Sequence, residues 1–207
     1  MFNTAPFRFL KIFGFILFVT VLYSCDKEVP LKFTETQIID RDETTIEINI
    51  PKAEGHSEAA KQINSALSQF VNSVLNIENS YPINVDTKKS IAGFKKSYAN
   101  FKTQMGNKLY TNLPVWEVII DGEILYTNKT LISMAMTSGV NTGAAHGNLV
   151  FEFYNFDIKT GKQLTTKNLI NDVQAFTILA KKYYDKELLS ANESRISAFE
   201  AKAFEIP

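Results

Sequence analysis

The sequence Thr142-Gly143-Ala144-Ala145-His146-Gly147-Asn148 lies at the centre of the segment, Ser138 to Asp172, around which the chain is organised. Its glycines stand among small residues, so the backbone there can adopt positive φ angles and pass close to other groups. An aromatic stretch, Leu149 to Phe156, follows and is expected to form a strand. The residues from Asp157 onward suit a turn in which a glycine is left-handed, before a partner strand resumes at Lys162. We therefore expect a glycine-rich connection between two strands, followed by a turn that reverses the chain.

Further strands are indicated by apolar residues that alternate with polar ones. The clearest runs from Thr44 to Ile50 and is expected to end at Pro51, and a weaker one runs from Phe33 to Ile39. The strands expected after Pro114 are Val115–Asp121, Ile124–Thr127 and Thr130–Ser138, with Asp121-Gly122 as the tight turn of a hairpin. Trp116 could stack on a sugar ring, but its apolar neighbours favour burial.

Three amphipathic helices are expected between and after these strands. Ser57 is the expected N-cap of the first, which runs to about Ile77, and the second begins at Asp86. The second carries an apolar stripe, for which core packing is a better interpretation than a ligand face: Ile91, Phe94, Tyr98, Phe101 and Met105. A short helical turn is expected at Thr165–Ile170, and a third helix begins at Asp172. The pattern indicates the α+β class, with an antiparallel sheet and helices packed on one face.

The N-terminal residues 1–24 have the pattern of a lipoprotein signal peptide. Arg8 and Lys11 precede an apolar run, Ile12 to Tyr23, which is short for a membrane span of about 20 residues. Leu22-Tyr23-Ser24-Cys25 resembles a lipobox, so we expect the chain to be cleaved before Cys25 and the Cys25 thiol to be acylated. Residues 25–32 then form a lipidated tether, and residues 33–207 a single domain. The expected partner of this end is the lipid bilayer, and the expected location is the outside of a bacterial membrane, inner or outer.

The composition argues against several classes of function. Without the two basic residues of the signal peptide, the 22 basic and 22 acidic residues of the chain leave a net charge of −2 and no basic block, which argues against nucleic-acid binding. Two histidines and one cysteine give no zinc-ligand spacing, so neither a metal site nor another cofactor is expected. No nucleophile elbow or phosphate-binding loop is present. A pair of glycosidase carboxylates could still be hidden among the acidic residues.

The candidate ligand-binding residues lie in and beside the glycine-rich connection: Asn141, Thr142, His146, Asn148 and Tyr154. His146 could contact a ligand or donate a proton. Because no acidic or nucleophilic residue stands beside it, we favour a structural role in which the imidazole bonds backbone groups and holds the loop. We expect His56 to be solvated and assign no catalytic residue.

The block Thr142–Gly147, together with Tyr154–Thr165, resembles the PdaC/RsiV-like family, and the resemblance extends over roughly residues 38–190. This resemblance implies an extracytoplasmic α+β domain, found in envelope lipoproteins, beside deacetylase catalytic domains and in anti-sigma factors that sense lysozyme. Only eleven residues precede the apolar run, so we expect no cytoplasmic segment that holds a sigma factor. Nor do we expect a catalytic deacetylase domain. Family members continue with a further strand after the segment that resembles Phe204–Pro207, so this sequence is expected to lack its last strand.

Three hypotheses follow. The first is a non-catalytic envelope lipoprotein in which the loop from Ser138 to Asn148 and the aromatic strand bind peptidoglycan-type glycan or a lysozyme-like protein. The second is an envelope polysaccharide hydrolase or deacetylase-related enzyme that uses an unseen carboxylate pair. The third is a structural assembly lipoprotein that pairs with a partner chain through an open sheet edge.

Overall fold

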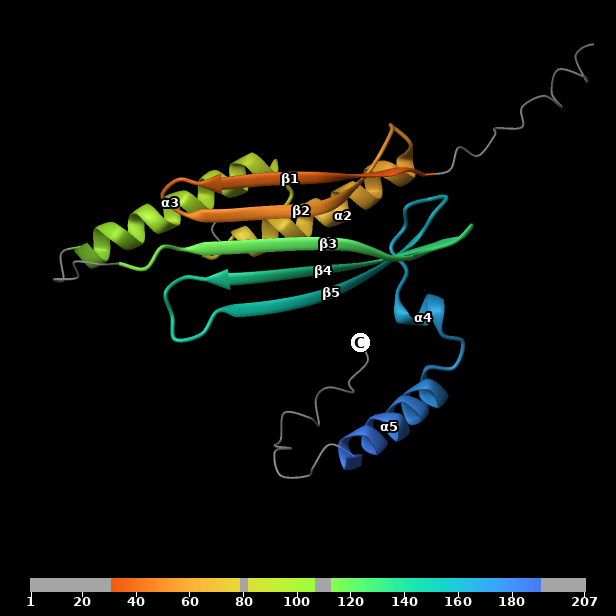
Figure 1. The fold of residues 1–207 in the computed structure, drawn as a ribbon. Helices are drawn as coiled ribbons and strands as arrows, with labels where there is room; N and C mark the ends of the chain where they lie inside the picture. The colour runs from red at the N-terminus through yellow and green to blue at the C-terminus, as the bar shows by residue number, and fades with distance from the viewer. Residues whose placement is uncertain (1–30, 79–81, 107–112, 191–207) are drawn as a thin grey trace, which may run out of the picture. The chain divides into compact units, whose positions relative to one another are not determined.

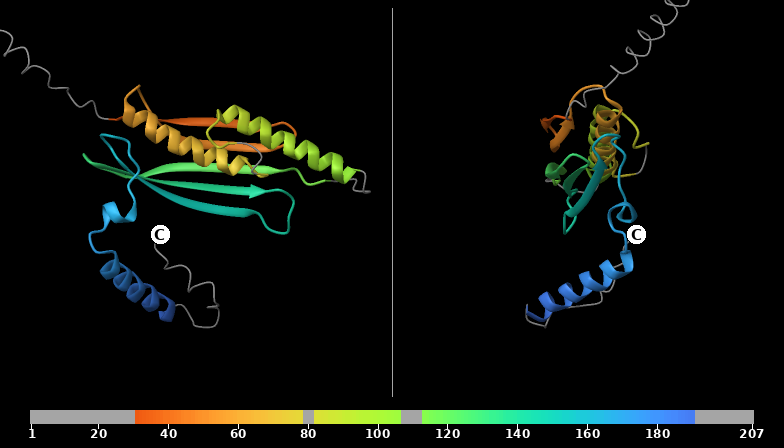
Figure 2. Two further views of the ribbon diagram at one scale, coloured as in Figure 1. Left: turned by 180° about the vertical axis from the view of Figure 1, so that it is seen from behind. Right: turned by 90° about the vertical axis from the view of Figure 1, so that its right-hand side faces the viewer.

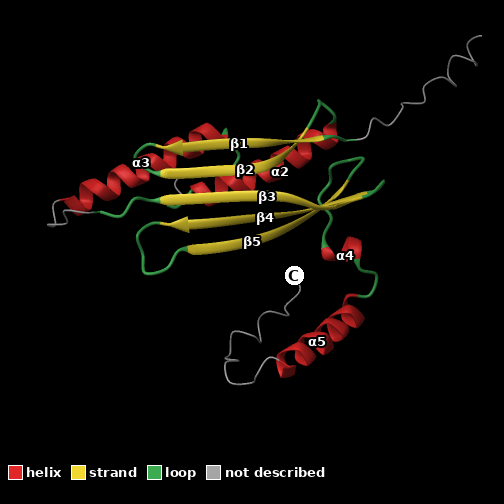
Figure 3. Ribbon diagram, viewed as in Figure 1, coloured by secondary structure: helices red, strands yellow, loops and turns green. Residues whose placement is uncertain are grey.

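The computed structural model describes residues 31–78, 82–106 and 113–190. In these ranges a five-stranded sheet has the order β1-β2-β3-β4-β5 (Figure 1). The strands are β1 (Phe33–Arg41), β2 (Thr45–Ala53), β3 (Glu117–Thr127), β4 (Leu131–Asn141) and β5 (Asn148–Asp157). The helices are α2 (Glu58–Leu75), α3 (Thr87–Gly106), α4 (Thr166–Leu169) and α5 (Val173–Ser190), shown in Figure 3. Residues 1–30, which include Cys25, and the C-terminal Phe204–Pro207 lie outside the described residues.

Helices α2 and α3 lie on one face of the sheet (Figure 2). The expected N-cap is confirmed, because the Ser57 hydroxyl accepts a hydrogen bond from the Ala60 N–H at 3.1 Å. Asn64 joins α2 to the end of β2 through two 2.8 Å hydrogen bonds with the backbone of Ala53. The apolar side of α2 is buried against the sheet: Ile63, Leu67, Phe70, Val71 and Leu75. The α+β class with helices on one face is therefore confirmed.

The aromatic stripe of α3 packs in the core, as expected. Phe94 is fully buried, and its ring centroid lies 5.7 Å from that of Trp116. Tyr98 and Phe101 contact the same indole ring at 5.6 and 5.3 Å. Trp116 itself is 6% exposed, so its expected burial is confirmed. This aromatic cluster attaches α3 to the start of β3.

The sheet is not wholly antiparallel, which corrects the sequence-based expectation. β2 and β3 pair in parallel, with Thr45 opposite Glu117 and Asn49 opposite Asp121. The other three pairings are antiparallel. A parallel pair needs a long crossover, and α2 and α3 together provide it between β2 and β3.

The hairpin expected at Asp121-Gly122 is wrong, because β3 continues without interruption through both residues. Gly122 is needed for close packing instead of for a turn. A Cβ at this position would lie 2.7 Å from Met136 Sδ and 2.8 Å from Pro51 Cδ. The strand then shifts register against β4 between Ile124 and Tyr126, which marks a bulge.

Pro51 does not end β2, which also differs from the expectation. β2 pairs with β3 only as far as Asn49, whereas its pairing with β1 continues to Ala53. Pro51 therefore has a paired strand on one side only, the position in which a sheet tolerates a missing N–H group.

The turn after β5 has the expected left-handed glycine, with a φ of 72° at Gly161. The Asp157 carboxylate organises this turn, accepting hydrogen bonds from the Thr160 N–H and hydroxyl, both at 2.8 Å, and from the Lys159 N–H at 3.1 Å. No strand resumes at Lys162 in the described residues. One bridge joins Phe156 to Gln163 instead. The expected helices after it are confirmed as α4 and α5.

The contribution of this turn to the stability of the fold is expected to depend on pH. The hydrogen bonds from Thr160 lower the pKa of Asp157 below its ordinary value. A lowered folded-state pKa stabilises the fold above the unfolded carboxyl pKa of about 3.9, and the stabilisation is lost as pH falls through the folded pKa. The melting temperature of Asp157→Asn should therefore fall less than that of the wild type as the pH is lowered from about 5 to 2. Parallel melting curves of the two proteins would contradict this assignment.

Candidate functional site

The candidate loop is the tip of the β4–β5 hairpin, and it is shorter than expected. β4 extends to Asn141 and β5 begins at Asn148, so residues 138–141 are strand, and the connection spans only residues 142–147. Asn141 and Asn148 stand at the two ends of the connection and are exposed, and Thr142 is half-buried. The structure thus brings Asn141, Thr142, His146 and Asn148 to one end of the sheet.

The hairpin tip is held by Asn141 and Gly143. The Asn141 Oδ1 accepts a hydrogen bond from the Gly143 N–H at 3.0 Å, and Gly143 has a φ of 81°. A Cβ at Gly143 would clash with the Pro114 ring, because it would lie 2.9 Å from Pro114 Cβ and closer still to Cγ. The connection therefore packs directly against the residues that precede β3.

His146 does not hold the loop in the way we expected. Its side chain is exposed, and it forms no hydrogen bond with any residue in the described ranges. The Asn141 amide and the contact of Gly143 with Pro114 provide the local structure instead. His146 is thus an exposed side chain at the hairpin tip.

Tyr154 is separated from the other four candidates. It lies on the helix-covered face, where its ring stacks on Phe156 at 5.9 Å and meets the edge of Phe70 in α2 at 6.4 Å. Its hydroxyl donates to the Glu152 carboxylate. Burial, and then this hydrogen bond, raise the pKa of Tyr154 above its ordinary value. Six residues of strand, or about 20 Å, separate it from Asn148.

The side chains that alternate with Tyr154 point away from the helices. Leu149, Phe151 and Phe153 are 64%, 61% and 68% exposed, and we call these three residues the apolar ridge. Their neighbours across β4 are small: Gly139, Thr137 and Ala135. The next strand, β3, places acidic side chains on the same face at Glu117, Asp121 and Glu123, which we call the acidic column. The ridge and the column are two strands apart, or about 10 Å.

A shallow hollow of about 230 Å³ connects this surface to the hairpin. Its floor is Gly139, above which a Cβ would meet no atom within 4 Å, and Ile119 and Leu149 stand on either side. Glu117, Asn141 and Asn148 also line it. Apolar walls with a few amide and carboxylate groups form a surface that can bind a ligand by contact and hydrogen bonding.

The loop from Ser138 to Asn148 and the aromatic strand were expected to form the contact surface, but Ile119 was not, and the sequence did not indicate which face of the strand takes part. The aromatic character of β5 was visible in the sequence, yet both of its faces are apolar, so alternation alone could not show which face is uncovered. Only the register against β4 separates Phe151 and Phe153 from Tyr154 and Phe156.

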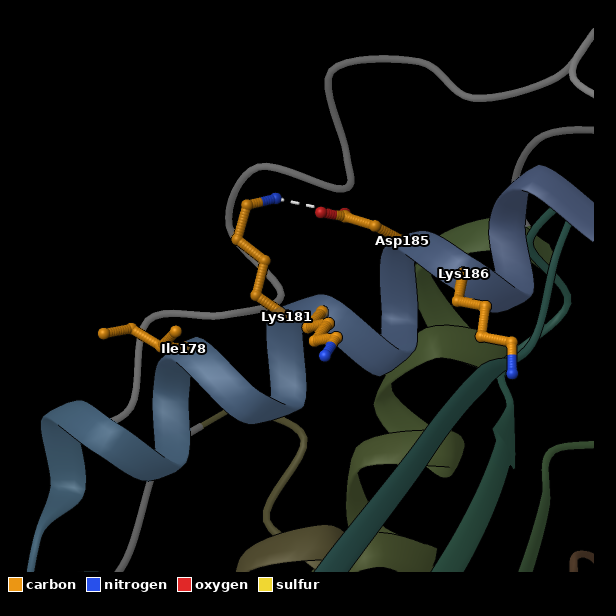
Figure 4. A pocket seen from close by; sticks show the side chains of 5 residues that line it. Ile178, Lys181, Asp185 and Lys186 are labelled. Atoms are coloured by element: carbon orange, nitrogen blue, oxygen red, sulfur yellow. Dashed lines mark hydrogen bonds and ion pairs between the residues drawn. The ribbon is translucent and has the colours of Figure 1, made fainter.

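A second hollow has no such combination of elements. It is lined by Ile178, Lys181, Lys182, Asp185 and Lys186, all of which belong to α5. Figure 4 shows these side chains extending from a single helix, with the Lys181–Asp185 ion pair at 3.1 Å between successive turns. We place the candidate site at the hollow above Gly139, because it combines three strands with the hairpin tip.

In residues 31–78, 82–106 and 113–190, no three His, Cys, Asp or Glu side chains gather into a group that could hold a metal ion. None of the helices in these ranges combines the length and apolar character that crossing a membrane requires.

Comparison with known proteins identifies the family. The family model described as deacetylase PdaC matches residues 39–149, more than half of the chain. The chain belongs to the PdaC family. The matched residues include β2, both covering helices, β3, β4 and the hairpin tip, so they contain the hollow. The activity in the family's description is a statement about the protein for which the family is named.

Two solved structures are similar to this PdaC-family chain, and one of them supports its fold. A DUF3298 family protein of Bacteroides fragilis NCTC 9343 is 16% identical, with a TM-score of 0.54 over 83% of this chain and 73% of that chain. A DUF3298 family protein of Pseudomonas aeruginosa PAO1 is also 16% identical, with a TM-score of 0.49 over 80% of this chain and 69% of that chain. The Bacteroides fragilis protein shows that the α+β fold is shared. No curated protein matches the chain.

Proposed function

We propose that this PdaC-family protein is a non-catalytic, lipid-anchored binding protein of the bacterial cell envelope, and that the face of its sheet opposite α2 and α3 binds a lysozyme-like protein. The observation that carries the proposal is the apolar ridge, formed by Leu149, Phe151 and Phe153, beside the glycine-floored hollow. Large, clustered, exposed apolar side chains mark interaction surfaces on soluble domains. The lipid anchor is supported by the sequence pattern that ends at Cys25.

The charges on this face favour a basic protein over an acidic glycan. Glu117, Asp121 and Glu123 lie along β3 on this face. Glu47 in β2 lies on the same face, opposite Ile119. Arg41, on the neighbouring edge strand β1, forms a 2.6 Å ion pair with Glu47. Complementary charge steers association and selects partners. Peptidoglycan-type glycan is the alternative ligand, which the apolar ridge could bind by stacking on sugar rings.

The test uses the double variant Asp121→Asn with Glu123→Gln. Its affinity for a basic lysozyme, measured by calorimetry at low salt, is expected to be about tenfold weaker than that of the wild type, with a smaller salt dependence. The control, Glu54→Gln with Glu78→Gln, makes the same charge change at two exposed acids outside this face and should bind like the wild type.

Three outcomes decide the proposal. If the two double variants bind lysozyme with equal affinity, the acidic column is not part of the binding surface. Retention on purified peptidoglycan that Phe153→Ala abolishes, without lysozyme binding, would select the glycan. Retention on neither ligand would overturn the proposal. The anchor is checked separately by mass spectrometry of the mature N-terminus, where an unacylated Cys25 thiol would contradict it.

A further inference from the structure

The outer edge of β5 carries backbone groups that point out of the sheet. Along a strand, the N–H and C=O of one residue point to the same side, and this side alternates from residue to residue. The Asn155 carbonyl accepts from Leu164 N–H at 2.7 Å, and the Asp157 N–H donates to the Lys162 carbonyl at 2.9 Å, so odd-numbered residues of β5 face outward. The chain returning at residues 162–164 thus covers the edge from Asn155 onward. In the described part of the chain, the outward groups of Leu149, Phe151 and Phe153 have no such partner.

As far as the described residues show, the stretch from Leu149 to Phe153 lacks the features that prevent strands from pairing with other chains. Natural edge strands are protected by charges, prolines, bulges or covering segments. The opposite edge strand, β1, carries Glu35, Asp40 and Arg41. The open part of β5 carries one charge, at Glu152, whose carboxylate is engaged by the Tyr154 hydroxyl on the helix-covered face.

We propose that a second copy of this chain adds to the sheet by antiparallel pairing of β5 with β5, with Phe151 on the two-fold axis. In this register Phe151 lies opposite its own copy, and Leu149 lies opposite Phe153 in both directions. Leu149, Phe151 and Phe153 then all take part in hydrogen-bonded pairs. In each pair, the two facing residues donate and accept one N–H···O bond each. The inference concerns assembly and goes beyond the proposed ligand.

Neighbouring registers are less favourable. Shifting the axis to Glu152 places two like charges opposite each other, which destabilises a strand pair. It also places Leu149 opposite Asn155, whose carbonyl is already occupied. Shifting the axis to Val150 leaves Phe153 opposite Gly147, outside the strand. The Phe151 register uses every free edge group and places Glu152 opposite Val150.

The proposed pairing also extends the binding surface. A two-fold axis perpendicular to the sheet keeps the helix-covered faces of both copies on the same side. The two apolar ridges then meet across the axis as one continuous strip, and both hollows open on the same face. Cross-strand pairs of aromatic and aliphatic side chains add to the stability of such a junction.

The test is the oligomeric state of the full chain in detergent, measured by sedimentation equilibrium. The wild type is expected to form a dimer, and Phe151→Lys should raise its dissociation constant at least about tenfold, because two lysines would face each other at the axis. Phe151→Glu should have the same effect. An equimolar mixture of the two variants should recover a heterodimer, since position 151 pairs only with itself in this register. Ile178→Lys, on exposed α5, is the matched control and should remain a dimer.

Each result decides the inference. A wild type that stays monomeric at every concentration would overturn it, as would a dimer that Phe151→Lys leaves intact. Two variants that are monomeric alone and also monomeric when mixed would overturn the register. Circular dichroism of each variant separates failure to pair from failure to fold. Because the measurement includes no ligand, its failure leaves the proposed binding function untouched.

Discussion

Replacing Phe94 by alanine is expected to lower the free energy of unfolding by about 3–5 kcal/mol, the usual cost of removing a buried phenylalanine. Phe94 is fully buried, and its ring contacts Trp116 at a centroid distance of 5.7 Å. The substitution leaves a cavity between α3 and the sheet, where Tyr98 and Phe101 also contact the indole. Because Trp116 is the only tryptophan in the chain, its fluorescence during urea unfolding reports directly on this cluster.

The control is Phe176→Ala on α5. Phe176 is 43% exposed and carries the same ring, so its replacement should change stability by no more than about 0.5 kcal/mol. A loss at Phe94 no larger than the loss at Phe176 would show that α3 is not attached through the Trp116 cluster.

The parts of the fold that depend on local pattern were predictable. The N-cap at Ser57 depends on a side-chain hydrogen bond within the first turn of α2, and the apolar stripe of α3 depends on the 3.6-residue period of a helix. The turn closed by Asp157 and Gly161 depends on short-range hydrogen bonds and on one left-handed residue. None of these features needs a partner that is distant in the sequence, so the residues themselves indicate them.

Features that depend on distant partners were missed. Gly122 has the sequence context of a turn, but its role is set by Met136 and Pro51, which approach from other strands. The parallel pairing of β2 with β3 joins segments that are separated by two helices. The alternating pattern of a strand does not indicate whether its partner runs parallel or antiparallel to it.

The candidate site was predicted in part, for the same reason. Asn141 and Asn148 were located because they flank a glycine-rich connection. Tyr154 was grouped with them because apolar residues lie on both faces of β5, and the structure places it against α2 instead. The hollow above Gly139 is formed by three strands side by side, which only the register reveals.

Replacing Gly161 by alanine is the second large effect that we expect, a loss of about 2–5 kcal/mol in the free energy of unfolding. The left-handed conformation at this position, with a φ of 72°, costs an alanine about 1–2 kcal/mol. In addition, the new Cβ would lie 2.6 Å from Ala59 Cα and closer still to the Ala59 carbonyl oxygen, and forced overpacking costs about 1–3 kcal/mol. Ala59 is in the first turn of α2, so neither backbone can move without disturbing the turn or the helix.

Gly139→Ala is the matched control, because it makes the same chemical change in open space. No atom lies within 4 Å of a Cβ at Gly139, so the expected change is within about 0.5 kcal/mol. Urea unfolding of both variants measures the difference. Equal losses would mean that the turn after β5 does not pack on α2. A large loss at Gly161 alone would show that the turn joins β5 to α2 and thereby helps to hold the ridge-bearing strand on the sheet. The binding surface would then depend on a contact on the helix-covered side of the protein.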